Sequence, residues 1–227
     1  MSLPSEAFAY ADGVLTTSGV DLRAVAEAHG TPTWVYSGER VDAAYRSITE
    51  AMAQASGGSE TLIAYAIKAN GNQALLKRLA ALGCGADIVS GGELLRALRA
   101  GIPAERIVYS GVGKSRAELR LALEKGIRAV HVESESELRL LGEVAADLGT
   151  TATIALRVNP NVDAETHPYI ATGLHSTKFG LELDVAERLV PEIVGDDRFP
   201  LDGVSCHIGS QLGSVDPLRE AVTLLAQ

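Results

Sequence analysis

The sequence contains few cysteines, few aromatic residues and no long apolar run. Its only cysteines among 227 residues are Cys84 and Cys206, and aromatic residues make up 4% of the chain. Two cysteines in apolar stretches indicate reduced thiols and not a disulfide framework. No apolar run approaches the ~18 residues that a membrane span requires, and the first residues lack the features of a secretion signal. We therefore expect a cytoplasmic protein that does not contact a membrane.

Positive charge is also scarce. The chain has 20 Lys and Arg residues against 29 Asp and Glu residues, a net charge of −9 at pH 7. A surface with this charge repels phosphate backbones, so nucleic acid is not an expected partner. The composition, 46% hydrophobic and 22% charged, is typical of a folded globular protein.

Short apolar runs alternate along the chain with segments of helical period. The predicted strands are residues 61–67, 86–89, 107–109, 129–132, 153–158 and 204–208. The predicted helices between them are residues 73–82, 92–100, 116–125, 135–148 and 185–194. Alternation of strand and helix at a near-constant interval predicts right-handed crossovers and a parallel sheet.

A repeated motif marks the helix boundaries. The pattern Ser-x-x-Glu-Leu follows three predicted strands, beginning at Ser90, Ser115 and Ser134. This is the capping box, in which the serine hydroxyl and the glutamate carboxylate each accept a backbone N–H of the first turn. Glycines stand where four helices should end, as C′ residues do: Gly83, Gly101, Gly126 and Gly149.

Six strand–helix units fit two architectures. One is a (β/α)8 TIM-like barrel with about six of its eight strands present, and the other is an open, doubly wound sheet. The near-constant length of the repeat favours the incomplete barrel. Outside the repeat, residues 8–15 and 33–36 are predicted strands and residues 21–29 a predicted helix. The chain ends at Gln227 within a helical pattern that starts at Pro217, and we interpret this end as a truncation.

Active sites of barrels form at the carboxyl ends of the strands. The polar residues at these ends, which we expect to converge, are Lys68, Asp87, Ser90, Ser110, Glu133, Arg157, Asn159 and His207. A lysine in a buried strand loses hydration unless its pKa falls or it forms a covalent bond, such as a Schiff base with a carbonyl cofactor. The alternative is a strand-end lysine whose amine extends to solvent.

His207 is compatible with several roles. It can act as an acid or base, bind a metal, stack on an aromatic cofactor or lie in the core. His167, His175 and His207 form no short ligand cluster, so we predict no metal site. The turn at Gly209 and Ser210 can present amides and a hydroxyl to a phosphate.

The segment from Gly111 to Ser115 resembles the end of a nucleotide-binding P-loop. The P-loop needs a glycine at position 108, where this chain has Val108. We therefore reject nucleotide binding and assign Ser115 to its capping box. Glu93 is equally well explained as the acid of a capping box.

Four segments together resemble the fold-type III pyridoxal-phosphate (PLP) decarboxylases, which act on ornithine, arginine and diaminopimelate. Residues 65–70 resemble the cofactor-lysine motif of this family, and residues 85–94 resemble its second motif. Residues 207–211 resemble the segment whose histidine stacks on the cofactor ring. The longest match, similar to the diaminopimelate decarboxylases, comprises residues 156–163, 166–173 and 178–180. The resemblance extends from about residue 8 to the end.

This resemblance implies a cofactor, PLP, and a role for each site residue. Lys68 would be the catalytic lysine that binds the cofactor covalently. His207 would lie over the face of the cofactor ring, and Ser210 would contact the phosphate. Arg157 would lie near the phenolic oxygen, and Asp87 close to the ring.

The resemblance also implies an activity and an organisation. The activity is decarboxylation of meso-2,6-diaminopimelate to L-lysine, the last step of lysine biosynthesis, by a homodimer. Residues 1–37 would contribute to a β-domain. Most of that domain would be absent from this chain, because family members are nearly twice as long. Residues 38–227 would form the truncated PLP-binding barrel, and this chain alone would be inactive. Glu93 would pair with Arg157.

Three alternatives are compared with this assignment, and the residues after Lys68 argue against the first of them. Alanine racemases share the barrel, but their lysine is followed by Ala-Tyr-Gly-His, whereas Lys68 is followed by Ala-Asn-Gly-Asn-Gln. A decarboxylase for ornithine, a D-amino acid or a carboxypolyamine is harder to distinguish. The third alternative is a non-catalytic PLP-binding barrel, which a stop codon directly after Gln227 would favour.

Overall fold

The computed structural model describes residues 7–162, 179–210 and 212–226. Its central sheet has six parallel strands in chain order: β4 (Ala64–Ala66), β5 (Gly85–Ile88), β6 (Ile107–Tyr109), β7 (Ala129–Val132), β8 (Ile154–Arg157) and β9 (Leu201–Ser205). Each strand joins the same edge of the growing sheet, as in a barrel, whereas a doubly wound sheet reverses direction midway. The prediction of an incomplete (β/α) barrel is confirmed, and the doubly wound alternative is wrong.

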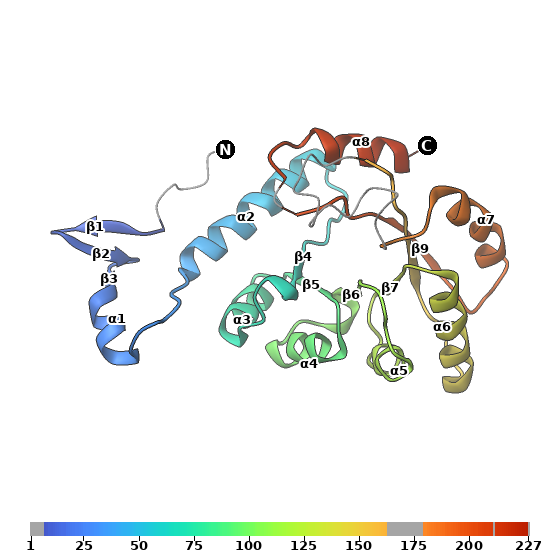
Figure 1. Cartoon of the computed structure of the whole chain (residues 1–227), viewed down its shortest axis with the longest axis horizontal. Coiled ribbons are helices and arrows are strands. Elements are labelled where there is room, and N and C mark those ends of the chain that lie inside the picture. Colours follow the sequence, from blue (N-terminus) through green and yellow to red (C-terminus); the bar gives the residue numbers. More distant parts are fainter. Residues whose placement is uncertain (1–6, 163–178, 211, 227) are drawn as a thin grey trace.

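Helices follow the strands and form an arc outside the sheet (Figure 1). They are α3 (Gln73–Ala81), α4 (Gly91–Ala100), α5 (Arg116–Lys125), α6 (Glu135–Leu148) and α7 (Leu183–Val194). Short 3-10 turns, η1 (Ile67–Ala69) and η2 (Ala104–Arg106), follow β4 and precede β6. Helix α8 (Asp216–Leu225) follows β9. Its observed start confirms the helical pattern expected from Pro217.

The core lies between the middle strands and these helices. One cluster joins β5 and β6 to α3 and α4 through residues such as Ile88 and Leu94, and another joins β7 and β8 to α6 and α7 through Leu141 and Leu156. All four side chains are fully buried, and each such burial stabilises the fold by about 1.5–3 kcal/mol. The outer strands β4 and β9 are only partly buried. The middle of the sheet is therefore the rigid part of the scaffold.

The predicted helix caps are present, but only one of the three boxes is reciprocal. Ser115 and Glu118 make both hydrogen bonds of the capping box. Ser90 and Ser134 each accept from the backbone N–H three residues on, whereas their glutamates bind elsewhere. Glu93 accepts the N–H of Val89, one residue before the cap. The predicted C′ glycines are confirmed, because Gly83, Gly101, Gly126 and Gly149 all have positive φ.

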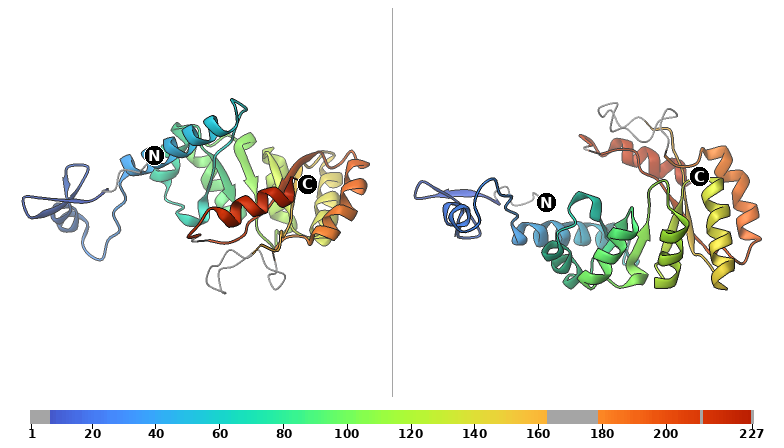
Figure 2. Two further views of the ribbon diagram at one scale, coloured as in Figure 1. Left: turned by 90° about the horizontal axis from the view of Figure 1, so that it is seen from above. Right: turned by 60° about the horizontal axis from the view of Figure 1, so that its bottom comes forward.

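The N-terminal region forms a separate antiparallel sheet. Its strands are β1 (Ala9–Ala11), β2 (Val14–Thr17) and β3 (Val20–Asp21), followed by helix α1 (Leu22–His29). Figures 1 and 2 show this unit standing away from the barrel. The prediction of one strand over residues 8–15 is wrong, because Asp12 and Gly13 both have positive φ and form a two-residue hairpin turn.

Two further predictions for this region need correction. Residues 33–36 do not form a strand. Helix α2 (Gly38–Ala55), which begins at an N-cap, Ser37, was not predicted. Apolar residues recur along α2 at helical spacing, although none of its residues is buried. None of the helices in the described part of the chain is both long and apolar enough to span a bilayer.

Candidate functional site

A cavity of about 650 Å³ lies at the carboxyl ends of the strands. Its lining includes all five residues that the sequence predicted for the site: Lys68, Asp87, Arg157, His207 and Ser210. They come from η1, β5, β8 and the segment after β9. Of the other strand-end residues that we expected to converge, Ser110 lines the cavity, whereas Ser90, Glu133 and Asn159 do not. Ser90 is instead the N-cap of α4.

Lys68 occupies an environment that differs from the sequence prediction. It lies in the 3-10 turn after β4, not within a buried strand, and it is exposed. The desolvation argument for this lysine is therefore wrong. Its amine makes no hydrogen bond or ion pair with the residues that the structure describes, so it is available on the wall of the cavity to a carbonyl compound.

His207 lies two residues beyond the end of β9, in the same cavity as Lys68. Burial lowers its pKa, and the positive charges of Lys68 and Arg157 lower it further, whereas Asp87 and Glu133 raise it. Lys68 and His207 line the same cavity although β4 and β9 are the two outer strands of the sheet. The sheet is therefore curved so that its first and last strands approach each other at the cavity.

Two buried polar atoms in the cavity wall have no partner among the described residues. They are Oδ1 of Asp87 and Oγ of Ser205, and both residues line the cavity. Unpaired buried polar atoms are costly and are typical of sites that bind a polar ligand. Together with an amine, an imidazole and a guanidinium, they fit a small anionic aldehyde such as PLP.

Arg157 is held by a buried ion pair. Its Nη1 donates to Oε1 of Glu133 at 2.6 Å, and the two side chains are 11% and 1% exposed. The pairing of Arg157 with Glu93 that the resemblance implied is therefore wrong. Register explains the difference, because β7 and β8 pair Val132 with Leu156, which places the following residues side by side. The Arg157 guanidinium also lies 5.5 Å from the centroid of the Phe179 ring.

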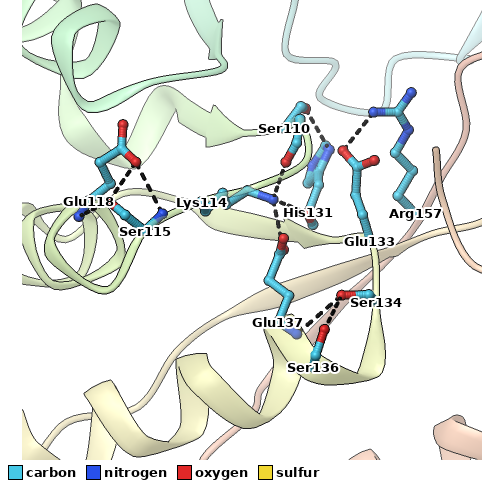
Figure 3. A network of polar contacts seen from close by, with 11 residues as sticks. Ser110, Lys114, Ser115, Glu118, His131, Glu133, Ser134, Ser136, Glu137 and Arg157 are labelled. Atoms are coloured by element: carbon cyan, nitrogen blue, oxygen red, sulfur yellow. Dashed lines mark hydrogen bonds and ion pairs between the residues drawn. The ribbon is translucent and has the colours of Figure 1, made fainter. Parts of the chain in front are cut away.

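A second polar cluster lies beside the cavity (Figure 3), and of its members Lys114, Glu137, Ser110 and His131 only Ser110 was expected at the site. Lys114 is buried and its Nζ lies 2.7 Å from Oε1 of Glu137. His131, on β7, lies 3.1 Å from the hydroxyl of Ser110, and both of these residues line the cavity. A polar residue alternating with buried apolar residues, as in Val130-His131-Val132, was the signal that could have identified His131.

Cys84 and Cys206 are free thiols, and burial raises the pKa of each. Within residues 7–162, 179–210 and 212–226, no cluster of three or more His, Cys, Asp or Glu side chains could hold a metal ion. The motif residues 166–173, His167, His175, Lys178 and Gln211 lie outside the described residues.

Fold and site together define an enzyme-like β/α barrel whose accessible lysine shares a cavity with an imidazole, a carboxylate and a guanidinium. Residues 39–227 match the family described as pyridoxal-dependent decarboxylase, pyridoxal binding domain. The chain belongs to this family, and the resemblance recognised from its sequence motifs is confirmed.

Individual relatives agree with this assignment. The chain is 47% identical to diaminopimelate decarboxylase of Pseudomonas aeruginosa over 97% of its own length and 52% of that protein. It superimposes with a TM-score of 0.91, at 40% identity, on diaminopimelate decarboxylase of M. jannaschii in co-complex with L-lysine, covering 99% of this chain and 53% of that one. Lysine decarboxylase of Selenomonas ruminantium, at 22% identity and a TM-score of 0.77, shares the fold; the match covers 93% of this chain and 51% of that one. The chain spans about half the length of these relatives.

Proposed function

We propose that this chain is the cofactor-binding part of a PLP-dependent decarboxylase that converts meso-2,6-diaminopimelate to L-lysine. The observation that carries the proposal is the convergence of Lys68, Asp87, Arg157, His207 and Ser210 on one cavity. The substrate is supported by the similarity to diaminopimelate decarboxylases over 97% of the chain. The lysine decarboxylase of Selenomonas ruminantium, at 22% identity, supports the fold alone.

Each of these residues has a proposed role. Lys68 would hold the cofactor through its amine, the group that can react with an aldehyde. His207 covers one face of the ring, and Ser210 contacts the phosphate. Arg157, fixed by Glu133, lies near the phenolic oxygen, and Asp87 lies close to the ring.

The reaction exchanges one carboxylate for a proton. The bond between the α-carbon and its carboxylate breaks, carbon dioxide leaves, and a proton takes its position. The cofactor, when bound, accepts the electron pair left behind. The described residues contribute binding and orientation: the amine of Lys68 anchors the ligand, and the charge of Arg157 holds its anionic edge.

We also propose the organisation and setting of the protein. Residues 1–37 contribute to a β-domain and residues 38–227 form the barrel; the separate sheet β1–β3 and the family match from residue 39 support this division. A homodimer in the cytoplasm is the proposed assembly and location. Residues 1–227 alone are proposed to be inactive, because the relatives are about twice as long.

The first test of this proposal is trapping of the cofactor. The protein, expressed from its complete reading frame, is mixed with PLP and reduced with borohydride, and the modified peptide is identified by mass spectrometry. The expected adduct is on Lys68 and is absent from Lys68→Ala. An unmodified Lys68 would refute the proposed cofactor chemistry.

A second test identifies the substrate. Release of carbon dioxide is compared for meso-2,6-diaminopimelate, L-ornithine and a D-amino acid, and the amine product is identified by chromatography. L-lysine from diaminopimelate is the expected product. Faster turnover of another substrate would replace the proposed substrate and leave the cofactor assignment intact.

A further inference from the structure

The floor of the cavity contains a hydrogen-bonded pair that has no role in the function proposed above. The Oγ atom of Ser110 lies 3.1 Å from Nδ1 of His131, and both residues line the cavity. They follow Tyr109 and Val130, which are partners in the register of β6 and β7. Their contact is thus fixed by the parallel sheet itself and not by a loop.

A buried ammonium holds the backbone of His131 and of Gly111, the residue after Ser110. Nζ of Lys114 donates to the carbonyl oxygens of Gly111, at 2.7 Å, and of His131, at 2.8 Å. Its third hydrogen bond goes to Glu137 at 2.7 Å, and the lysine side chain is 1% exposed. Gly111 directly follows Ser110, so one cation fixes the main chain on both sides of the pair (Figure 3).

The surroundings of His131 favour its neutral form. Burial lowers its pKa, and the positive charges of Lys114 and Arg157 lower it further, against the opposite effects of Asp87 and Glu133. A neutral imidazole has one donor and one acceptor nitrogen. When the hydroxyl of Ser110 donates to Nδ1, the proton of the ring is on Nε2, which becomes a hydrogen-bond donor.

PLP and amino-acid substrates carry acceptors of the matching kind: a phosphate, a phenolic oxygen and carboxylates. We propose that His131, oriented by Ser110, contacts the bound cofactor by donating a hydrogen bond from Nε2, and that Lys114 is the positioning residue for this pair. This inference rests on the proposed function, because it takes PLP as the ligand of the cavity. It assigns a contact from β7, a strand that contributes none of the five residues proposed above.

The test compares two substitutions of His131 in the protein expressed from its complete reading frame. Gln places an amide N–H near the position of Nε2, whereas Leu has no donor. PLP affinity is measured by titration of the visible absorbance of the adduct. We expect His131→Leu to bind PLP about threefold to tenfold more weakly, the range of one net hydrogen bond, and His131→Gln to remain within about twofold of the native protein.

Two further variants separate positioning from general damage. Ser110→Ala is expected to weaken PLP binding in the same direction as His131→Leu, and circular dichroism confirms that each variant is folded. If Lys114 acts through His131, the effects of Lys114→Met and His131→Leu on PLP affinity are non-additive, and both variants shift the absorbance band of the adduct. A structural role alone gives additive effects and an unchanged band.

The outcomes are distinct from those of the cofactor test. Equal PLP affinity in the native, Gln and Leu proteins would overturn the contact, as would equal weakening in Gln and Leu, because loss of the ring and not of its N–H would then explain the change. If His131→Leu does not fold, an unchanged affinity in Ser110→Ala overturns the proposal. Failure of the native protein to form an adduct at Lys68 refutes the proposed function itself.

Discussion

The two lysines at the cavity hold their charge in opposite ways. In the buried cluster beside the cavity, here called the floor, Lys114 and Glu137 are 1% and 7% exposed and are paired with each other. The exposed lysine of the cavity wall, Lys68, is here called the rim. On the rim, Lys68 is exposed and has no ion pair with the described residues. Because a buried charge is stable only when it is compensated, the floor is built to stay unchanged. The rim amine has no partner to give up before it reacts. The contrast supports the proposal that Lys68 is the reactive lysine and Lys114 a structural one.

The largest expected effect comes from breaking the floor. Lys114→Met leaves Glu137 buried without its cation and should cost about 3–5 kcal/mol of the free energy of unfolding. Lys114→Met combined with Glu137→Met removes both charges and should recover part of this loss. Urea unfolding followed by circular dichroism measures both. A single variant as stable as the native protein would contradict the contrast between floor and rim.

A carboxylate of intermediate exposure should give a smaller effect. Hydrogen bonds from the N–H of Gly91 and from the side chain and N–H of Ser115 lower the pKa of Glu118 from 4.5 to about 2. Its contribution is therefore complete above about pH 4.5 and is lost as the pH falls toward 2. Glu118→Gln should cost about 1–2 kcal/mol at pH 7, after allowance for solvent screening.

Stability measured from pH 7 to pH 2 tests this sign. The native protein should lose its advantage over Glu118→Gln as the solution is acidified. A difference that stays constant with pH would show that the hydrogen bonds of Glu118 do not depend on its charge.

Exposed ion pairs should contribute least to stability. Arg116 pairs with Glu143 and with Asp147 on the surface of α6, and its side chain is 48% exposed. Arg116→Ala should therefore change the free energy of unfolding by less than about 1 kcal/mol. Thermal unfolding at low and high salt measures the effect. A loss as large as that of Lys114→Met would remove burial as the explanation of the difference.

The last prediction concerns the rim alone and changes a pKa. The charge of Lys68 lowers the pKa of His207, although burial is the larger cause. Lys68→Met should therefore raise the pKa of His207 without restoring its ordinary value. NMR titration of the imidazole measures this shift. An unchanged pKa would place the two side chains too far apart to serve one ligand.

Capping signals explain why the middle of the chain was predictable. Helices α5 and α6 begin and end at the predicted residues, because each has a serine N-cap and a glycine with positive φ beyond its last turn. Helix α2 also has a serine N-cap, Ser37, and apolar residues at helical spacing, but it follows no strand of the repeat and was not predicted. Local hydrogen-bonding chemistry is encoded in a few adjacent residues, and it was recognised only where the strand–helix repeat pointed to a helix.

The site was predictable where chemistry coincides with strand ends. Lys68, Asp87 and Arg157 follow that rule and line the cavity. The partner of Arg157 was predicted wrongly, since only the register of β7 and β8 places Glu133 beside it. His131 was missed for a similar reason. It lies within a strand, and only the structure shows that its side chain points to the face of the sheet that borders the cavity.

The curvature of the sheet has a consequence for experiment. Lys68 and His207 extend from opposite margins of one continuous hydrogen-bonded ladder, yet they border the same hollow. The distance between these two side chains therefore depends on the curvature of the whole six-stranded sheet. The visible absorbance of a covalent adduct at Lys68 would thus report changes in that curvature.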